Sequence, residues 1–403
     1  MAIEVDAPLA PRRRDWLPSV LRSLLVPLLA ILTALVIGAI IIWLSAPTDR
    51  GTRTEVVLRA YRGLFLGAFG SRGAIANTLV EATPYILAGL GVALAFKCGL
   101  FNIGAEGQLF IGALASAAVG FGVTGLPALI HLPLALLAGA VAGALWGGIP
   151  GYLRARTGAH EVITTIMLNY IAFRMLDYLV NGPLKDRTAS LPRTPFIQAS
   201  AQLPRFISPL ESADLTGGQQ YRPLIVSADP NWGLRLHLGF VVALLAVWLI
   251  WWLLNRTTAG FEIKTVGANP EAARYAGMNI TKNFVLAMAL SGALAGLAGT
   301  GQVLGLERNI KSVFSSGYGF DSIAIALLAK SNPIAIVPAA IFWGALNSGK
   351  GLMQAQTGIS SDLIRIVQAL TIMFVAADQI IRWIYRLQEP QGERVVFSRG
   401  WGK

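Results

Sequence analysis

Long apolar runs recur along almost the whole chain, and no other feature constrains the fold as strongly. A helix that crosses a membrane needs about 20 mainly apolar residues, and ten segments approach this length. The eighth is too short to cross alone as a regular helix, so we expect it to begin within 313–317 or to be broken. The ten segments are residues 24–43, 77–96, 104–123, 127–149, 161–181, 236–254, 284–303, 318–330, 333–350 and 362–381.

The composition supports an all-α integral membrane protein with about ten transmembrane helices. The 403 residues are 54% hydrophobic and only 13% charged, whereas a soluble domain carries about 25% charged residues. The 43 glycines suit helices that pack backbone to backbone in lipid. The net charge of +12 is not read as a nucleic-acid site, because lysines and arginines of membrane proteins collect in cytoplasmic loops.

The distribution of basic residues predicts that both termini are cytoplasmic. With the N-terminus inside, the inner segments hold 17 of the 33 lysines and arginines. The first apolar run, at about 20 residues, exceeds the apolar core of a signal peptide, so we expect it to be retained as a span.

Three regions follow from this topology. Residues 1–70 contain a cytoplasmic tail, the first span and a helix over 54–70 that we expect on the outer surface. Residues 71–381 form the transmembrane domain, with an outer loop at 182–235 predicted to cap the outer mouth and a cytoplasmic loop at 255–283. Residues 382–403 form a cytoplasmic tail.

The sequence offers no catalytic site, cofactor site or metal site. The segment GALNSGKG at 344–351 resembles a phosphate-binding loop, but Gly351 replaces the required Ser or Thr and the segment lies in an apolar span. After His160 and Glu161, Thr164 replaces the second histidine of a zinc-protease motif. A single cysteine and three scattered histidines argue against a metal cluster. If ATP is used, another chain binds it.

The cytoplasmic loop contains VGANPEAARYAGMN at 266–279. Asn269 is a suitable helix N-cap, Pro270 suits the first position, and Gly277 is a natural left-handed end. Glu271 favours the positive end of the helix dipole. The pattern predicts a helix of about two turns, which is marginal alone. It either rests on the bilayer or docks into another protein through a face of small residues, namely Ala272, Ala273 and Ala276.

Polar residues interrupt two apolar spans. GLFNIGAEGQLFIGA at 99–113 places Asn102, Glu106 and Gln108 where an unpaired carboxylate is costly. They either cap the third span or line a polar passage, and both roles can coexist. In GYGFDSIAIA at 317–326, the triplet centred on Asp321 echoes the one centred on Asn102. Interrupted spans in matching positions of two halves mark transport paths, so an inverted repeat is possible.

The fifth span adds further polar groups. Thr164, Thr165 and Asn169 either complete a polar lining or form interhelical hydrogen bonds. Arg174 and Asp177, three residues apart, are expected to form an internal ion pair. The residues that we predict along a passage are Asn102, Glu106, Gln108, Thr165, Asn169 and Asp321.

Four ordered motifs resemble bacterial ABC importer permeases, especially the nucleoside-type branch of the nucleoside and simple-sugar family. EAARYAG, from Glu271 to Gly277, looks like the Glu-Ala-Ala-x-x-x-Gly coupling motif of these permeases, although the Leu-Pro that follows in the better-known version is absent. GLFNIGAEGQ, HEVITTIMLNYIA at 160–172 and GFDSIAIALLAKSNP at 319–333 also resemble this family. The resemblance covers roughly residues 75–380.

The resemblance implies a non-catalytic subunit of an ATP-driven importer that moves a nucleoside by alternating access in the bacterial cytoplasmic membrane. A cytoplasmic ATPase would hydrolyse ATP, a second and usually different permease would pair with the chain, and an extracytoplasmic binding protein would deliver solute. The alternatives are a simple-sugar permease, for instance for pentoses, and a proton-coupled secondary transporter using Glu106 or Asp321. The residues implied in ATPase coupling are Asn269, Pro270, Glu271, Ala272, Ala273, Arg274 and Gly277.

Overall fold

The structure is a computed structural model, and it describes residues 19–46, 51–209, 223–227, 235–312, 314–315 and 317–387. Each of the ten apolar segments contains a helix. The ten helices are α1 Ser19–Ser45, α3 Arg72–Lys97, α4 Ala105–Gly122, α5 Ala128–Thr157, α6 Glu161–Asn181, α7 Gly239–Arg256, α10 Ile280–Gln302, α11 Tyr318–Leu328, α12 Pro333–Thr357 and α13 Asp362–Ala376.

Six helices of the described chain are long and apolar enough to cross a membrane: α1, α3, α5, α6, α7 and α10. The chain is therefore a multi-pass membrane protein, whereas the count of ten spans and the orientation of the termini stay predictions. α11 is shorter, with 11 residues, and it begins at Tyr318 rather than within 313–317. The segment is short, and its helix is continuous from Tyr318 to Leu328. A π-helical stretch, η5 Val303–Glu307, follows α10 directly and extends it.

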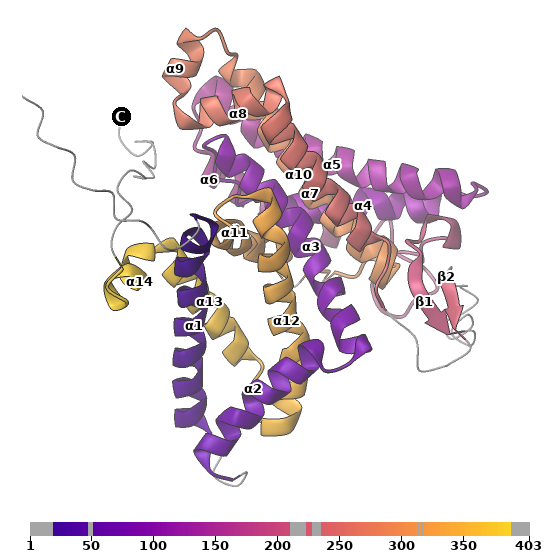
Figure 1. Cartoon of the computed structure of the whole chain (residues 1–403). Helices are drawn as coiled ribbons and strands as arrows, with labels where there is room; N and C mark the ends of the chain where they lie inside the picture. Colours follow the sequence, from indigo (N-terminus) through magenta and orange to yellow (C-terminus); the bar gives the residue numbers. More distant parts are fainter. Residues whose placement is uncertain are drawn as a thin grey trace, which may run out of the picture.

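The helices form two packed groups joined by α12 (Figure 1). The larger group surrounds α3 and α10, with α4, α5 and α7 against them. The smaller group combines α1, α2 Arg53–Phe69, α12 and α13, and α14 Asp378–Ile384 contacts α1 beside it. Side chains of α3 are almost all buried along its membrane-length part, so α3 is the central helix of the larger group.

Glycines bring α5 and α10 into backbone contact, as the glycine content predicts. Gly139, Gly143 and Gly147 on α5 face Gly292 and Gly296 on α10. A Cβ atom on any of these five residues would overlap the backbone or a side chain of the opposite helix or of α4. Small residues at every fourth position are the usual way in which helices approach closely in lipid.

The predicted helix over 54–70 is present as α2. Arg59 and Arg62 are exposed, as the interpretation of a surface helix requires. On its other side α2 packs along α12, where Gly67 lies against the backbone of Gly349. The smaller group therefore also uses close helix contact.

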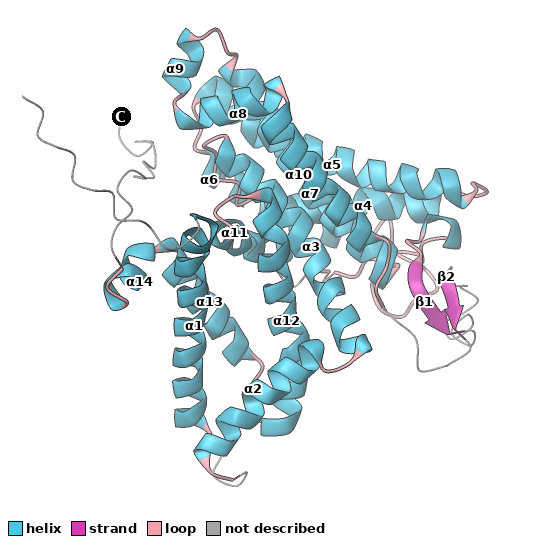
Figure 2. Cartoon of the chain, viewed as in Figure 1, coloured by secondary structure: helices cyan, strands magenta, loops and turns pink. Residues whose placement is uncertain are grey.

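The chain is mostly helical, as the sequence predicts, and the loop at 182–235 adds one pair of short strands. The described part of this loop contains a short 3-10 helix, η2 Ala199–Ala201, and two strands, β1 Arg205–Pro209 and β2 Pro223–Ser227, which pair in parallel (Figure 2). Backbone amides of the loop donate to carbonyls that follow α10: Thr194 to Ile310 at 2.9 Å and Leu203 to Leu304 at 2.9 Å. These hydrogen bonds hold the loop against the segment that follows α10. The role of the loop as a cap stays a prediction.

The two motifs dismissed on sequence grounds lie at α12 and at the start of α6. The phosphate-loop look-alike at 344–351 lies inside the continuous helix α12, not in a loop. His160 is the N-cap of α6, and Glu161 pairs with Arg154 at 3.3 Å.

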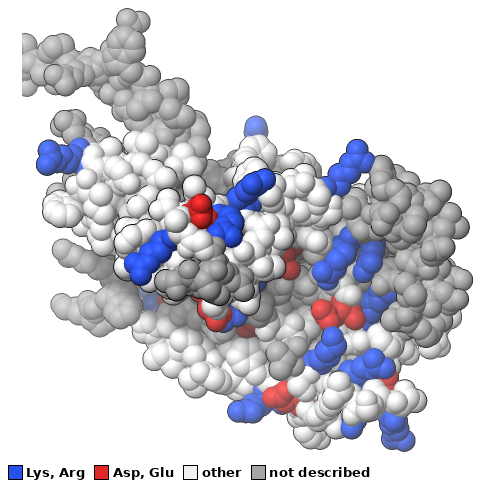
Figure 3. All heavy atoms as spheres, turned by 90° about the horizontal axis from the view of Figure 1, so that it is seen from below, with Lys and Arg blue, Asp and Glu red and all other residues white. Residues whose placement is uncertain are grey.

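The view from below shows lysines and arginines interspersed with fewer acidic side chains over that face (Figure 3).

Candidate functional site

Asn102 is the centre of a buried hydrogen-bond network at the start of α4. Its Nδ2 donates to Gln108 Oε1 at 2.9 Å and to Ser291 Oγ of α10 at 2.8 Å. Its Oδ1 accepts from the Gly104 amide at 2.9 Å and from Gln108 Nε2 at 3.1 Å. Asn102, Gln108 and Ser291 are each at most 1% exposed. Every hydrogen-bonding atom of the Asn102 side chain therefore has a partner within the chain.

α6, the fifth predicted span, completes this hydrogen-bond network. Asn169 accepts from the Gly107 amide at 2.8 Å and donates to the Ile103 carbonyl at 3.0 Å. Thr165 donates to the Glu161 carbonyl at 2.7 Å. Both side chains are buried. The N-cap of α4 is Gly104, and Asn169 of α6 accepts from an amide in the first turn of α4, whereas Asn102 binds the amide of Gly104 just before the helix.

Glu106 joins the two polar interruptions. Its side chain is 2% exposed, and its Oε2 accepts a hydrogen bond from the Gly319 amide at 2.5 Å. Gly319 lies so close to the backbone of Glu106 that a Cβ atom would overlap it. The carboxylate therefore caps the N-terminus of α11, where the helix dipole favours negative charge.

Asp321, one turn into α11, lies in a second polar group between α3 and α12. The Tyr85 hydroxyl donates to Asp321 Oδ2 at 3.1 Å, and Trp343 Nε1 donates to the same oxygen at 3.1 Å. Asn347 donates to the Tyr85 hydroxyl at 2.8 Å and accepts from Lys350 Nζ at 3.2 Å. The bonds form a continuous chain from Lys350 to Asp321.

Glu81 extends this group. Tyr318 donates to Glu81 Oε2 at 3.2 Å, and the Tyr318 ring meets the Tyr85 ring edge-on with centroids 5.0 Å apart. We name the set the polar cluster, and its members are Glu81, Tyr85, Tyr318, Asp321, Trp343, Asn347 and Lys350. Apart from Tyr85 and Trp343, they are only partly buried.

Basic side chains lie near the two carboxylates of the polar cluster. Lys350 lies near both carboxylates, Arg365 of α13 lies near Asp321, and Arg235 lies near Glu81. Partly exposed ionisable groups between membrane helices face protein or a water-filled space, not lipid. The cluster therefore marks a polar surface inside the helical group.

Sequence reasoning found Asp321 but missed the other members of the polar cluster. Glu81 and Lys350 carried a usable signal, because each is a charged residue within an apolar span. The aromatic and amide members gave no such signal, because these types are common in helix interiors and only the fold brings them to Asp321.

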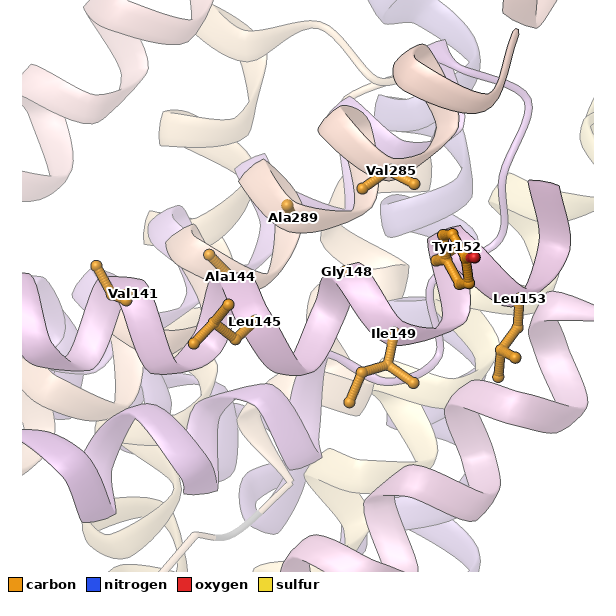
Figure 4. A pocket seen from close by; sticks show the side chains of 9 residues that line it. All are labelled: Val141, Ala144, Leu145, Gly148, Ile149, Tyr152, Leu153, Val285 and Ala289. Atoms are coloured by element: carbon orange, nitrogen blue, oxygen red, sulfur yellow. The ribbon is translucent and has the colours of Figure 1, made fainter. Parts of the chain in front are cut away.

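A groove between α5 and α10 is apolar, in contrast to the polar cluster. Its volume is about 480 Å³, and Figure 4 shows that aliphatic side chains line it, with the Tyr152 ring at one end. It offers a polar solute almost no hydrogen-bonding partner. We therefore place the candidate path at the polar cluster rather than here.

The loop at 255–283, which we predict to be cytoplasmic, contains the predicted capped helix. α8 Thr258–Ala268 leads into α9 Pro270–Tyr275, and Asn269 Oδ1 accepts from the amides of Glu271 and Ala272 at 3.0 and 3.1 Å. Gly277 adopts φ +82°, the left-handed end that the sequence predicts. α9 has six residues, so it is slightly shorter than the expected two turns.

The exposed surface of α9 differs from the expected face of small residues. Ala272 and Ala276 are exposed, but Ala273 is fully buried within the chain and instead holds α9 in place. The missed feature is Tyr275, which is 97% exposed. Glu271 and Arg274 pair at 3.4 Å on the surface. A groove of about 440 Å³ runs beside the end of α9, between α8 and the start of α10.

The end of α8 contacts the turn that leads to the hydrogen-bond network around Asn102. Gly267 packs against the backbone of Lys97 and Cys98, and Gly99 (φ +75°) packs against Gly267. Asn283 of α10 ties the same region together by donating to Glu262 of α8 at 2.8 Å. The loop bearing α9 is therefore in direct backbone contact with the segment that ends at Asn102.

Comparison with known proteins agrees with this architecture. Residues 74–376 match the family model described as the permease component of the branched-chain amino acid transport system. The chain belongs to this permease family. It is 43% identical to the guanosine ABC transporter permease NupP of Bacillus subtilis, over 92% of this chain and 98% of that protein.

Two further relatives also align along nearly their whole length. The glucose ABC transporter permease TsgB13 of Haloferax volcanii is 36% identical over 94% of this chain and 93% of its own length. The nucleoside ABC transporter permease NupB of Lactococcus lactis is 35% identical over 94% of this chain and 96% of its own length. The family predicted from the four motifs is thus confirmed, and the chain is an ABC-type permease subunit.

Proposed function

We propose that this permease moves a nucleoside across the bacterial cytoplasmic membrane as part of an ATP-driven importer. The observation that carries the solute class is the full-length similarity to the guanosine permease, at 43% identity, supported by the nucleoside permease at 35%. A simple sugar is the second candidate, because the glucose permease is 36% identical over a similar length.

The importer would contain a second, different permease. Bacillus subtilis, Lactococcus lactis and Haloferax volcanii each have two relatives, one similar to this chain over more than nine tenths of its length and one over 68–80% at 24–26% identity. This chain is of the first type, so a partner of the second type would complete the passage. A cytoplasmic ATPase and an extracytoplasmic binding protein complete the assembly.

The solute would pass along the polar cluster. Its amide group, its hydroxyl groups and its aromatic rings suit a solute with hydroxyl groups and a planar base. Asp321 would contact the path. The remaining predicted path residues, Asn102, Glu106, Gln108, Thr165 and Asn169, would set the positions of α4 and α11 beside it, because their side chains are buried and hydrogen-bonded.

Coupling would run through α9. The ATPase would hold Tyr275 and the exposed polar residues of α9, and its closure on ATP would move α8. Because Gly267 contacts the Lys97–Gly99 turn, that movement would reach the starts of α4 and α11. We assign the coupling role to Asn269, Pro270, Glu271, Ala272, Ala273, Arg274 and Gly277, with Ala273 acting from inside.

We also keep the regional division as part of the proposal. Residues 1–70, 71–381 and 382–403 would be the N-terminal region, the transmembrane domain and the C-terminal tail, with both termini cytoplasmic and ten helices traversing or entering the membrane. The loop at 182–235 would meet the binding protein, and that at 255–283 the ATPase.

The test is co-purification of the tagged chain from its own host in mild detergent. An ATPase and a second permease should accompany it, and Gly277→Val or Glu271→Lys should release the ATPase. Gly125→Val is the matched control, because Gly125 has φ +80° and, like Gly277, open space around its Cβ position. A chain that purifies alone and transports solute without ATP would favour the proton-coupled alternative.

A further inference from the structure

One face of α6 is exposed although the helix is long and apolar enough to cross a membrane. α6 packs against α4 and α5 through a buried stripe that includes Thr165, Asn169 and Leu176. The opposite side carries an exposed stripe at helical spacing. We call it the α6 stripe, and its members are Ile163, Met167, Tyr170, Arg174 and Tyr178.

Arg174 argues against a stripe that faces lipid along its whole length. Its side chain is 86% exposed, and Asp177, at 3.9 Å, is its ion-pair partner and is itself 41% exposed. The pair predicted from the sequence is present, but it is not internal to the chain. Arg174 lies seven residues before the end of α6 at Asn181, which is about 10 Å of helix. An arginine at such a depth faces protein or water, because exposure to lipid is costly.

The rest of the stripe argues against water. Ile163 is 60% exposed and Met167 is 51% exposed, and a water-filled passage is not built on such a surface. Tyrosine, methionine and arginine are enriched where proteins contact one another, and tyrosine and arginine are the residues that most often dominate binding. The combination fits a protein surface of mixed character at membrane depth.

We infer that the α6 stripe is the contact surface for the second permease subunit. Neither the ATPase nor the binding protein reaches the middle of a membrane helix, whereas a second permease does. The paired relatives in three organisms supply a partner of this kind. Because Arg174 keeps most of its donors exposed beside Asp177, a partner that presents a carboxylate or free helix carbonyls at the same depth would fit it. This inference rests on the proposed importer.

The experiment places a photo-crosslinking phenylalanine derivative at Tyr170 in the complete transporter in its own membrane. Leu137 on α5 is the matched control, because Tyr170 and Leu137 are both 61% exposed. Tyr170 should yield a covalent product with the second permease at least ten times more abundant than Leu137 does. Equal yields, products with lipid alone, or no product from Tyr170 overturns the inference.

A second measurement separates the surface from the proposed function. Arg174→Leu should reduce the second permease that co-purifies with the chain by about tenfold, and Arg174→Lys should retain part of it. The ATPase content of the same sample is the reference. If neither the ATPase nor the second permease is present with the unaltered chain, the importer itself is wrong. If both remain at full ratio with Arg174→Leu, only the α6 stripe is wrong.

Discussion

Gly267→Ala should uncouple the transporter without touching α9. Gly267 lies in the last turn of α8, and a Cβ atom there would approach the carbonyl carbon of Cys98 to 2.8 Å. The obstacle is backbone, so no side chain can rotate away. Inserting a methyl group into a packed contact costs about 1–3 kcal/mol. A cost of that size displaces an equilibrium between docked and undocked arrangements by about 5- to 150-fold.

The control is Gly351→Ala on α12, because Gly351 is helical and has open space around its Cβ position. Alanine gains about 0.5–1 kcal/mol over glycine in a helix interior, and both variants receive that gain. The assay compares ATP-driven uptake and ATP hydrolysis in proteoliposomes that contain the whole complex. We expect uptake by Gly267→Ala to fall 5- to 150-fold relative to the control while the ATPase remains bound, by the same conversion. Unchanged uptake per ATP would refute transmission through this contact.

Three further outcomes follow from the structure. Asp321→Leu leaves two buried donors without their acceptor, and uptake should fall at least tenfold, about 1.4 kcal/mol, with normal complex assembly; unimpaired uptake contradicts the path. Gly292→Val should destabilise the purified chain by about 1–3 kcal/mol through overlap with α5, seen as a lower melting temperature, whereas Gly148→Val, whose nearest atom is 3.9 Å away, should not. The hydroxyl and amide of Thr188, with Arg193, hold the pKa of Asp186 below its usual 3.8. The stabilisation of the loop by the ionised Asp186 is therefore complete above pH 3.8 and is lost as the pH falls below it. Hydrogen exchange at residues 186–194, corrected for intrinsic rates, should rise below pH 3.8 and not between pH 7 and 5.

Local signals predicted the short helix α9 well. The N-cap at Asn269, the proline after it and the left-handed Gly277 each depend on backbone geometry within a few residues, so the sequence determines them directly. The same holds for the helix over 54–70. The fate of Ala273 was not predictable, because the side of a six-residue helix that faces inward depends on α8 and α10.

The polar interruptions show where local reasoning ends. The sequence showed that Glu106 needs a partner, but the partner is the Gly319 amide, more than 200 residues away. Asn102 was expected at a helix start, yet its hydrogen bond to Ser291 depends on how α10 crosses α4. The parallel pairing of β1 and β2 likewise joins short strands separated in sequence, and neither strand has the length or alternation that predicts a sheet.

The measurement that tests the account most directly is uptake of labelled guanosine by proteoliposomes containing the co-purified complex and its binding protein. The account predicts uptake that requires ATP on the ATPase side, that stops with Gly277→Val and that continues with Gly125→Val. Guanosine uptake by this chain alone, driven by a proton gradient and independent of ATP, would contradict it.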